Sequence, residues 1–368
     1  MRKVSSRWGV VLGLVLTALL FGWAPVARYV RAAEFLQRLA EKPANVPGIA
    51  TQDLTIPGKN GPIRARLYFR AGAKPGDAIV VAHGVHYRGI DERRLVPFAR
   101  ALAETGLTVL TPELTELADY RITASGVDVI RESVSYLARR RDHVAATRVG
   151  LLGFSFAGGL SLVAVEDPKT AALVSAVTSV GGHHDVRRVL RFLIHNEIET
   201  PHGVVRQKAH EYGLVVVVYG NLEHFVPAQD LPAMREGFKA WLHEDQKSAR
   251  AAAHARTTPE AERLWQLLEK GQLQTLAPEL DALLHSQNAE LAAISAVGHM
   301  KSLNVPVYLL HGSHDSVIPS SETDAANQEL DGAEHQALVS PLLEHVEVSK
   351  TAGLGDKLAL VSFMAKVL

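Results

Sequence analysis

The feature that most constrains this chain is a short strand-like run followed at once by a serine among small residues. Residues 148–152 read Arg-Val-Gly-Leu-Leu, and residues 153–159 read Gly-Phe-Ser-Phe-Ala-Gly-Gly. A serine on a sharp strand-to-helix turn has a strained backbone, so the residues two before and two after it must be small. Gly153 and Ala157 meet this need, although glycine is usual at the second place. The segment predicts a nucleophile at Ser155; the alternative is an ordinary turn or helix cap.

Composition limits the partners and the chemistry of the chain. Its 368 residues, 47% of them apolar, suffice for one large domain with an insertion or for two domains. Lys+Arg and Asp+Glu both number 39, and no basic stripe with interleaved aromatic residues is present, so we expect no nucleic acid partner. The absence of cysteine excludes disulfides, thiolate metal sites and a cysteine nucleophile.

The first residues predict a membrane anchor. Residues 8–27 contain no charged side chain, and Trp8 and Trp23 stand near the two ends of this run. About 20 apolar residues span a bilayer, whereas the apolar part of a cleaved signal peptide has about 7–15. We therefore predict an uncleaved transmembrane segment within residues 1–27, with secretion after cleavage as the alternative. Basic residues flank both sides, and we expect a periplasmic or extracellular body, with a cytoplasm-facing body as the alternative.

The rest of the chain divides into a stalk, a core and an insertion. Residues 28–48 begin with a helical pattern that Pro43 and Pro47 end, and form the predicted juxtamembrane stalk. Residues 52–57 and 63–70 read as a hairpin. Apolar runs then alternate with helical stretches over the core segments 49–185 and 301–368, as expected for buried parallel strands. Residues 186–300 predict a helical cap, in which residues 214–219 are either a strand or a buried helix.

An activated serine also needs two backbone donors for the oxyanion that develops on the substrate. The apolar run 78–82 leads directly into His83, Gly84 and Val85. Gly84 permits a tight turn, so we expect the N–H groups of Val85 and Phe156 to be these donors. A histidine and a glycine after a strand are also consistent with an ordinary turn.

The serine further needs an acid and a base, which should follow it in that order. Asp315 lies between Gly312 and Pro319, after the second predicted strand that follows Ser155, and is our candidate acid. The rival acid is Asp185, which follows the strand predicted at residues 172–180. Asp315 could instead form an Asx turn or cap the next helix.

Topology selects one histidine among 17 as the base. His345 follows the last predicted strand at residues 336–339, whereas His335 precedes that strand and should lie at the opposite edge of the sheet. His183 and His184 lie next to Asp185, but neighbouring side chains in an extended chain point to opposite sides. We therefore expect no metal site there. We also expect no cofactor.

With these motifs in this order, the chain resembles the α/β-hydrolase superfamily over residues 50–368. The resemblance rests on His83 and Gly84 for the oxyanion turn and on the elbow from Gly153 to Ala157. It rests also on the segment 311–319 around Asp315 for the acid and on His345 for the base. It implies an α/β-hydrolase fold: an eight-stranded, mostly parallel sheet with the inserted helical cap over its carboxyl edge, here behind an N-terminal transmembrane helix.

The expected function is that of a membrane-anchored serine hydrolase. Ser155, Asp315 and His345 would cleave carboxylic esters of small or lipid-like apolar molecules through an acyl-enzyme. Residues 189–194 and 214–219 would line an apolar pocket under the cap. The alternatives are a thioesterase, peptidase or acyltransferase with the same three residues, or a non-catalytic ligand-binding protein. The oligomeric state stays open.

Overall fold

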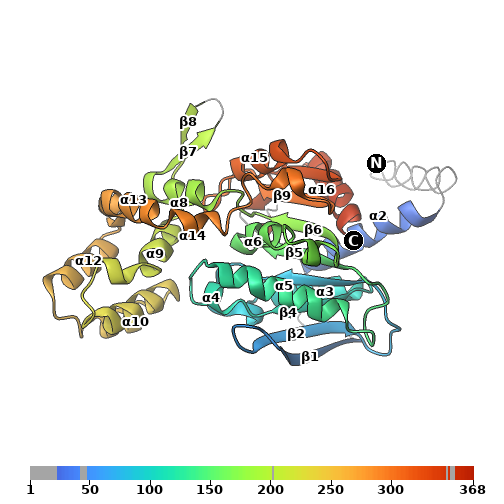
Figure 1. Cartoon of the computed structure of the whole chain (residues 1–368), viewed down its shortest axis with the longest axis horizontal. Coiled ribbons are helices and arrows are strands. Elements are labelled where there is room, and N and C mark those ends of the chain that lie inside the picture. The colour runs from blue at the N-terminus through green and yellow to red at the C-terminus, as the bar shows by residue number, and fades with distance from the viewer. Residues whose placement is uncertain (1–22, 42–47, 201–202, 345–346, 349–352) are drawn as a thin grey trace, which may run out of the picture.

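The core is one twisted sheet whose strands are mostly parallel. The computed structural model describes residues 23–41, 48–200, 203–344, 347–348 and 353–368. Eight strands lie in the order β1-β2-β4-β3-β5-β6-β9-β10 (Figure 1). In that order their bounds are Ile49–Ile56, Ile63–Arg70, Thr108–Pro112, Ala78–Ala82, Val149–Phe154, Val174–Val180, Val307–Gly312 and His335–Ser340. Only β2 runs against its neighbours, so the predicted hairpin and the predicted mostly parallel sheet are both confirmed.

Helices cover both faces of this sheet, which explains why its strands read as continuous apolar runs. Every residue of β3, β4 and β9 is buried. Val80 and Leu151 pack into one apolar cluster with α5 (Ala124–Ala138) and α6 (Phe156–Ala164). Ile79 and Leu152 pack into the other cluster. That second cluster contains residues of α2 (Trp23–Glu41), α3 (Leu95–Glu104) and α16 (Leu354–Val367). Alternate residues of each strand therefore serve opposite faces.

The remaining short elements of the core connect these strands and helices. They are η1 Gly89–Asp91, α4 Thr115–Ala118, α7 Pro168–Ala171, η4 Met300–Ser302, α15 Ser321–Glu329, β11 Leu343–Glu344 and β12 Glu347–Val348.

A helical insertion separates β6 from β9 and lies beside the carboxyl edge of the sheet (Figure 1). Its elements are α8 Val186–His195, β7 Glu197–Thr200, β8 Gly203–Arg206, α9 Glu211–Tyr219, η2 Leu222–His224, α10 Leu231–Leu242, α11 Gln246–Ala253, α12 Pro259–Glu269, η3 Leu273–Leu276, α13 Ala277–Ser286 and α14 Asn288–Ala292. The ambiguous residues 214–219 are part of α9. All of them are buried, so packing on every side outweighs the preference of valine for strands. The exposed hairpin of β7 and β8 was not predicted.

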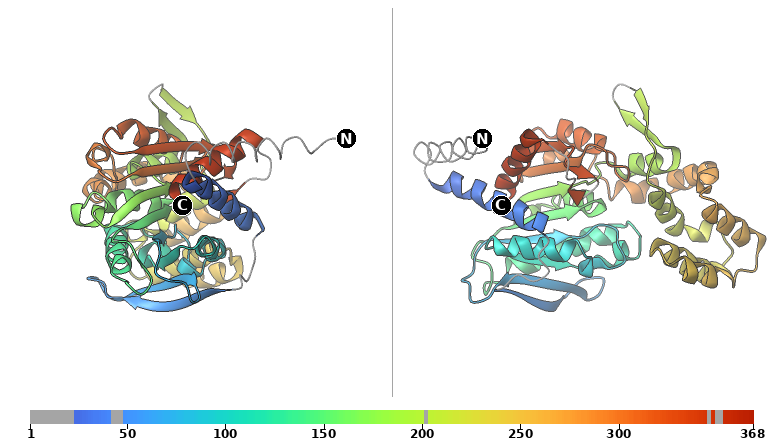
Figure 2. Two further views of the ribbon diagram at one scale, coloured as in Figure 1. Left: turned by 90° about the vertical axis from the view of Figure 1, so that its right-hand side faces the viewer. Right: turned by 180° about the vertical axis from the view of Figure 1, so that it is seen from behind.

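Helix α2 packs on the body. It contacts α16 and α3, and Ala32 and Phe35 on its inner face are buried. The Arg31 guanidinium donates to the backbone oxygen of Leu368. Figure 2 shows α2 and α16 at the end of the body away from the cap. The predicted stalk helix over residues 28–41 therefore forms one side of the core rather than a separate spacer.

The predicted membrane segment falls mainly on residues 1–22, which lie outside the described part of the chain. Among the described residues, no helix combines the length and the apolar character needed to cross a bilayer. The anchor within residues 8–27 thus stays a prediction.

Candidate active site

Ser155 occupies the sharp turn that the sequence predicts. Strand β5 ends at Phe154 and α6 begins at Phe156, with Ser155 between them at φ 54° and ψ −132°. This backbone conformation is sterically costly for any residue that has a Cβ atom, and it persists only where the surrounding structure enforces it. The Ser155 N–H donates to the oxygen of Val180 at 2.8 Å, which fixes the turn to the neighbouring strand β6.

The packing around this turn explains why alanine is acceptable at position 157. A Cβ atom added at Gly153 would lie 2.2 Å from the oxygen of Ala157. One added at Gly158 would lie 2.5 Å from Ser179 Oγ, and one at Gly159 would lie 2.3 Å from the His183 ring. The positions that require glycine are therefore 153, 158 and 159. Ala157 is fully buried, and its methyl group belongs to the apolar cluster beneath α6.

The turn after β3 lies directly against the serine. A Cβ atom added at Gly84 would approach Ser155 Cβ to 3.0 Å and Ser155 Oγ to 3.7 Å. Val85, Ser155 and Phe156 line the same cavity. Within the described residues, no hydrogen bond occupies the N–H of Val85 or of Phe156. The structure thus brings the two candidate oxyanion donors to the candidate nucleophile.

His83 holds the peptide that carries one of these donors. Its Nδ1–H donates to the oxygen of Gly84 at 2.8 Å, and its Nε2 accepts the N–H of Leu114 at 2.9 Å. Because the backbone N–H can only donate, Nε2 must be unprotonated. Burial lowers the pKa of His83 despite the Glu113 carboxylate at 3.9 Å, so the ring is neutral. In a trans peptide the C=O and N–H point in opposite directions, so His83 also orients the Val85 N–H.

Replacing His83 by alanine should therefore impair turnover more than binding. We expect kcat to fall by about 10²-fold with little change in KM, because a misplaced donor weakens oxyanion stabilisation. Ester kinetics of the folded variant measure both parameters. His335→Ala is the matched control, since His335 lies at the start of β10 and its Nδ1 bonds to Ala333 O. An unchanged kcat in a folded His83→Ala protein would contradict the assignment.

Asp315 lies in the predicted turn after β9 and is 1% exposed. Its Oδ1 accepts the N–H groups of Val317 at 2.8 Å and Ile318 at 2.9 Å. Its Oδ2 lies 3.5 Å from Nε2 of His311, which itself bonds to the oxygen of Ile318. The backbone donors hold the carboxylate in one orientation at the carboxyl edge of the sheet, the edge that also carries Ser155.

His345, the predicted base, lies outside the described residues, and its role stays a prediction. The described chain on either side of it forms the pair β11 and β12, with Glu344 opposite Glu347. β11 contacts β9, the strand that leads to Asp315. His335 pairs with Val307 at the first residue of β9, whereas Ser340 pairs with Gly312 at its last. His335 therefore lies at the opposite edge of the sheet, as predicted.

The rival acid Asp185 and its neighbouring histidines connect the cap to the core. Asp185 Oδ1 accepts the N–H of Arg187 at the start of α8, and its carboxylate pairs with the Arg187 side chain. The His183 Nε2 bonds to Ile294 O, and the His184 Nε2 bonds to Glu329. Within the described residues, no group of three metal-ligating side chains comes together.

The end of the cap that joins the core at the start of α8, here called the cap root, is fixed by one buried carboxylate. Glu322 of α15 is 2% exposed, and its Oε2 accepts the N–H groups of His184 and Asp185 at 2.9 and 2.7 Å. Its Oε1 accepts Arg188 Nε at 2.8 Å. These contacts tie the start of α8 to the core, so we infer that this end of the cap is rigid.

Buried histidines should make the protein less stable in acid. Burial lowers the pKa values of His83, His183 and His184. Below about pH 6.5 these three histidines therefore bind protons in the unfolded chain but stay unprotonated in the folded chain. The free energy of unfolding should be highest above that pH and fall as the pH decreases toward the folded pKa values, by up to about 1.4 kcal/mol per pH unit for each histidine. Urea denaturation at several pH values checks this, and His184→Gln should show a shallower decline. Equal stability at pH 7.5 and 5.5 would contradict it.

Ser155 lies in the wall of a cavity of about 720 Å³ between the core and the cap. As predicted, the cap runs 189–194 and 214–219 contribute to its wall, with Leu190, Leu193, Val216 and Val217. The start of α9 is also tied to the acid turn, because the His210 N–H donates to Ser316 O and the Gln207 amide to Asp315 O.

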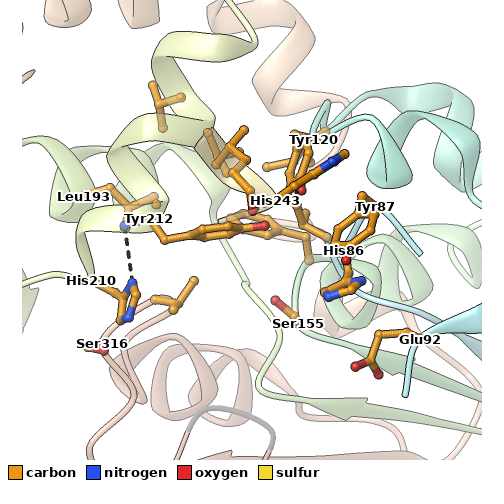
Figure 3. A pocket seen from close by; sticks show the side chains of 18 of the residues that line it. His86, Tyr87, Glu92, Tyr120, Ser155, Leu193, His210, Tyr212, His243 and Ser316 are labelled. Carbon is orange, nitrogen blue, oxygen red and sulfur yellow. Dashed lines mark hydrogen bonds between the residues drawn. The ribbon is translucent and has the colours of Figure 1, made fainter. Parts of the chain in front are cut away.

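Four aromatic side chains from the core and the cap cover this cavity, and we call them its roof: Tyr87, Tyr120, Tyr212 and His243. Sequence reasoning missed them. Tyr87 of the core stacks on His243 of the cap with ring centroids 4.0 Å apart. Tyr120 of the core packs edge to face against Tyr212 of the cap, with ring centroids 6.1 Å apart. Figure 3 shows these rings above Ser155. Burial raises the pKa values of Tyr120 and Tyr212, so both hydroxyls stay protonated. No local pattern marks these four residues, although Tyr120 has a positive φ of 60° in the structure.

Comparisons with known proteins bear on the fold. No protein-family model matches the chain, and no curated protein matches it significantly. Among solved structures, it is similar to an acetyl xylan esterase from Paenibacillus sp. R4, with 14% identity over 92% of this chain and 94% of that one, and a TM-score of 0.50. A Pyrobaculum calidifontis esterase shares 15% identity over 93% and 92% of the two chains at a TM-score of 0.48. A 2,6-dihydroxy-pseudo-oxynicotine hydrolase shares 17% identity over 99% of this chain and 84% of that one, at a TM-score of 0.49.

The first of these likenesses, together with the strand order, defines the class. The chain has the α/β-hydrolase fold, which it shares with this acetyl xylan esterase, and at this identity the likeness concerns the fold alone.

Proposed function

We propose that this protein is a serine hydrolase that cleaves carboxylic esters through an acyl-enzyme. One observation carries the proposal: Ser155 sits at a strained positive φ, directly against the turn of Gly84 and Val85, inside a cavity. Such strain at a cavity wall is characteristic of a positioned nucleophile. The fold shared with an acetyl xylan esterase agrees with this chemistry.

The proposed reaction has two halves. His345, oriented by Asp315, takes the proton of Ser155 Oγ as the oxygen attacks the ester carbonyl. The N–H groups of Val85 and Phe156 hold the oxyanion, and His345 then gives its proton to the leaving alcohol. A water molecule enters, loses a proton to His345 and attacks the acyl-enzyme. Collapse of the second oxyanion returns the proton to Ser155 and releases the acid.

The cavity suits a small ester. Its volume of about 720 Å³ lies within the usual range for small-molecule sites, and its wall combines the aliphatic residues of the cap with the aromatic roof. The carbonyl would sit at Ser155, and the apolar or planar part would lie against Tyr120 and Tyr212.

A substrate panel tests the proposed reaction against its alternatives. We expect p-nitrophenyl acetate to be hydrolysed with a much larger kcat/KM than an acetyl thioester or a dipeptide amide. Faster turnover of the thioester or the amide would make the protein a thioesterase or a peptidase. Transfer to an added alcohol in preference to water would make it an acyltransferase. No turnover of any of them would favour a ligand-binding protein.

We further propose that residues 8–27 anchor the protein in a membrane with the body on the outer side. The support is the charge-free run itself, with a tryptophan near each end. Protease accessibility of the body in intact cells tests the orientation. Recovery of the full chain in the soluble fraction would overturn the anchor.

A further inference from the structure

The loop that follows the oxyanion turn brings three arginines to the cavity. Arg88, Arg93 and Arg94 all line it, and all come from the ten residues after Val85. Arg94 is neutralised, because its Nε donates to Glu92 Oε1 at 2.9 Å. Arg88 and Arg93 form no ion pair with any residue that the structure describes. Arg88 and the exposed Arg93 therefore border the cavity, and neither is paired with a carboxylate among the described residues.

Arg88 is held in place by an aromatic ring rather than by an acid. Its Nε donates to the Tyr87 hydroxyl at 3.0 Å, and its guanidinium carbon lies 5.2 Å from the centre of the Tyr87 ring. The Tyr87 ring is in turn stacked on His243. Arg88 is half-buried. A guanidinium in this setting keeps its terminal donors for a planar anion and is less screened by water than a surface charge.

The acids of the cavity wall do not cancel these charges. Glu92 is occupied by Arg94 and by the N–H groups of Arg94 and Leu95 at the start of α3. Glu244 is exposed and lies on the cap. Against these two carboxylates stand three guanidinium groups, so the wall carries an excess of positive charge beside the reaction centre.

We propose that the physiological substrate is an ester that carries a carboxylate, which Arg88 and Arg93 bind while the ester carbonyl lies at Ser155. This inference rests on the proposed esterase function. Arg88 follows the oxyanion donor Val85 by three residues, which span at most about 10–11 Å of chain. Arg88 is therefore close to the oxyanion donor along the chain, and we place the carboxylate within reach of the Arg88 side chain. A flat spacer such as a benzene ring would fit between this carboxylate and the scissile carbonyl, under the rings that Figure 3 shows over Ser155.

Two aryl acetates of similar shape but different charge test this proposal on the full-length protein. 4-Acetoxybenzoate carries the carboxylate, and 4-acetoxybenzamide, which also has only one ester group, is its neutral counterpart. We expect the wild-type protein to prefer the anionic ester by about tenfold or more in kcat/KM, mainly through KM, since charged hydrogen bonds contribute to binding. High salt should reduce the preference.

Substitutions then assign the preference to the two arginines. In Arg88→Ala, Arg93→Ala and the double variant, the ratio of kcat/KM for the two esters should fall toward one, whereas Arg88→Lys should keep part of it. Arg235→Ala is the matched control, because Arg235 pairs with Glu223 on the cap and does not line the cavity.

The outcomes separate this inference from the function on which it rests. Equal turnover of both esters by the wild type, or a preference that survives in the double variant, would overturn the carboxylate site and leave the esterase intact. Turnover of p-nitrophenyl acetate but of neither of these esters would likewise overturn only the carboxylate site, whereas absence of turnover of all three would overturn the proposed function and this inference together.

Discussion

Ser155→Ala should lower kcat by about 10⁴–10⁶-fold while leaving the fold and substrate binding largely unchanged. The reason is chemical, because the substitution removes the only atom that can form the acyl-enzyme. The backbone cost of φ 54° is similar for serine and alanine, so stability should change little. Steady-state kinetics with a chromogenic acetate ester measure the effect. Turnover near that of the wild type would show that Ser155 is not the nucleophile.

A second variant at the same position separates strain from chemistry. Ser155→Gly is equally inactive in this account, but glycine adopts the observed backbone conformation without a steric cost. Relief of strain of about 1–3 kcal/mol exceeds the extra entropy that glycine loses on folding, which is about 0.5–1 kcal/mol, so its free energy of unfolding should exceed that of Ser155→Ala by about 1 kcal/mol. Urea denaturation of the two variants side by side provides the measurement. A glycine variant less stable than Ser155→Ala would contradict a strained turn.

Asp315→Asn should lower kcat by about 10³–10⁴-fold without unfolding the turn. The asparagine oxygen can still accept the N–H groups of Val317 and Ile318, so the loop should persist. The neutral amide cannot stabilise the imidazolium that forms as His345 takes the serine proton. Single-turnover kinetics would place the defect in acylation.

The rival acid supplies the matched control. Asp185→Asn should retain most of its kcat, because Asp185 bonds to the start of α8 and to Arg187 at the cap root. It should instead lower the free energy of unfolding by about 1 kcal/mol, since Arg187 is partly exposed and the ion pair is screened. A larger loss of kcat in Asp185→Asn than in Asp315→Asn would reverse the assignment of the acid.

Local patterns in the sequence were sufficient to predict the core of this fold. Buried parallel strands such as β3 and β5 read as continuous apolar runs, and the small residues after β5 require the sharp turn at Ser155. The turn at Gly84 and the position of Asp315 followed from their places at the ends of strands, where such sheets build their sites. The geometry also explains the one irregularity, since the close contacts fall at Gly153, Gly158 and Gly159 rather than at position 157.

The roof of the cavity could not be predicted in the same way. Tyr87, Tyr120, Tyr212 and His243 come from four segments of the core and the cap, and only the folded chain brings them together. The valine run in α9 favours a strand by propensity, and burial on all sides decides for a helix. The hairpin of β7 and β8 is short and exposed, so it leaves little apolar alternation in the sequence.

The central claim is that Ser155 is an activated nucleophile, and reaction with a fluorophosphonate probe tests it most directly. The full-length protein would be labelled and the modified peptide mapped by mass spectrometry. The account predicts one adduct, on Ser155, which is absent from Ser155→Ala and forms much more slowly in Asp315→Asn. No adduct on the folded wild-type protein, or an adduct that persists in Ser155→Ala, would contradict it.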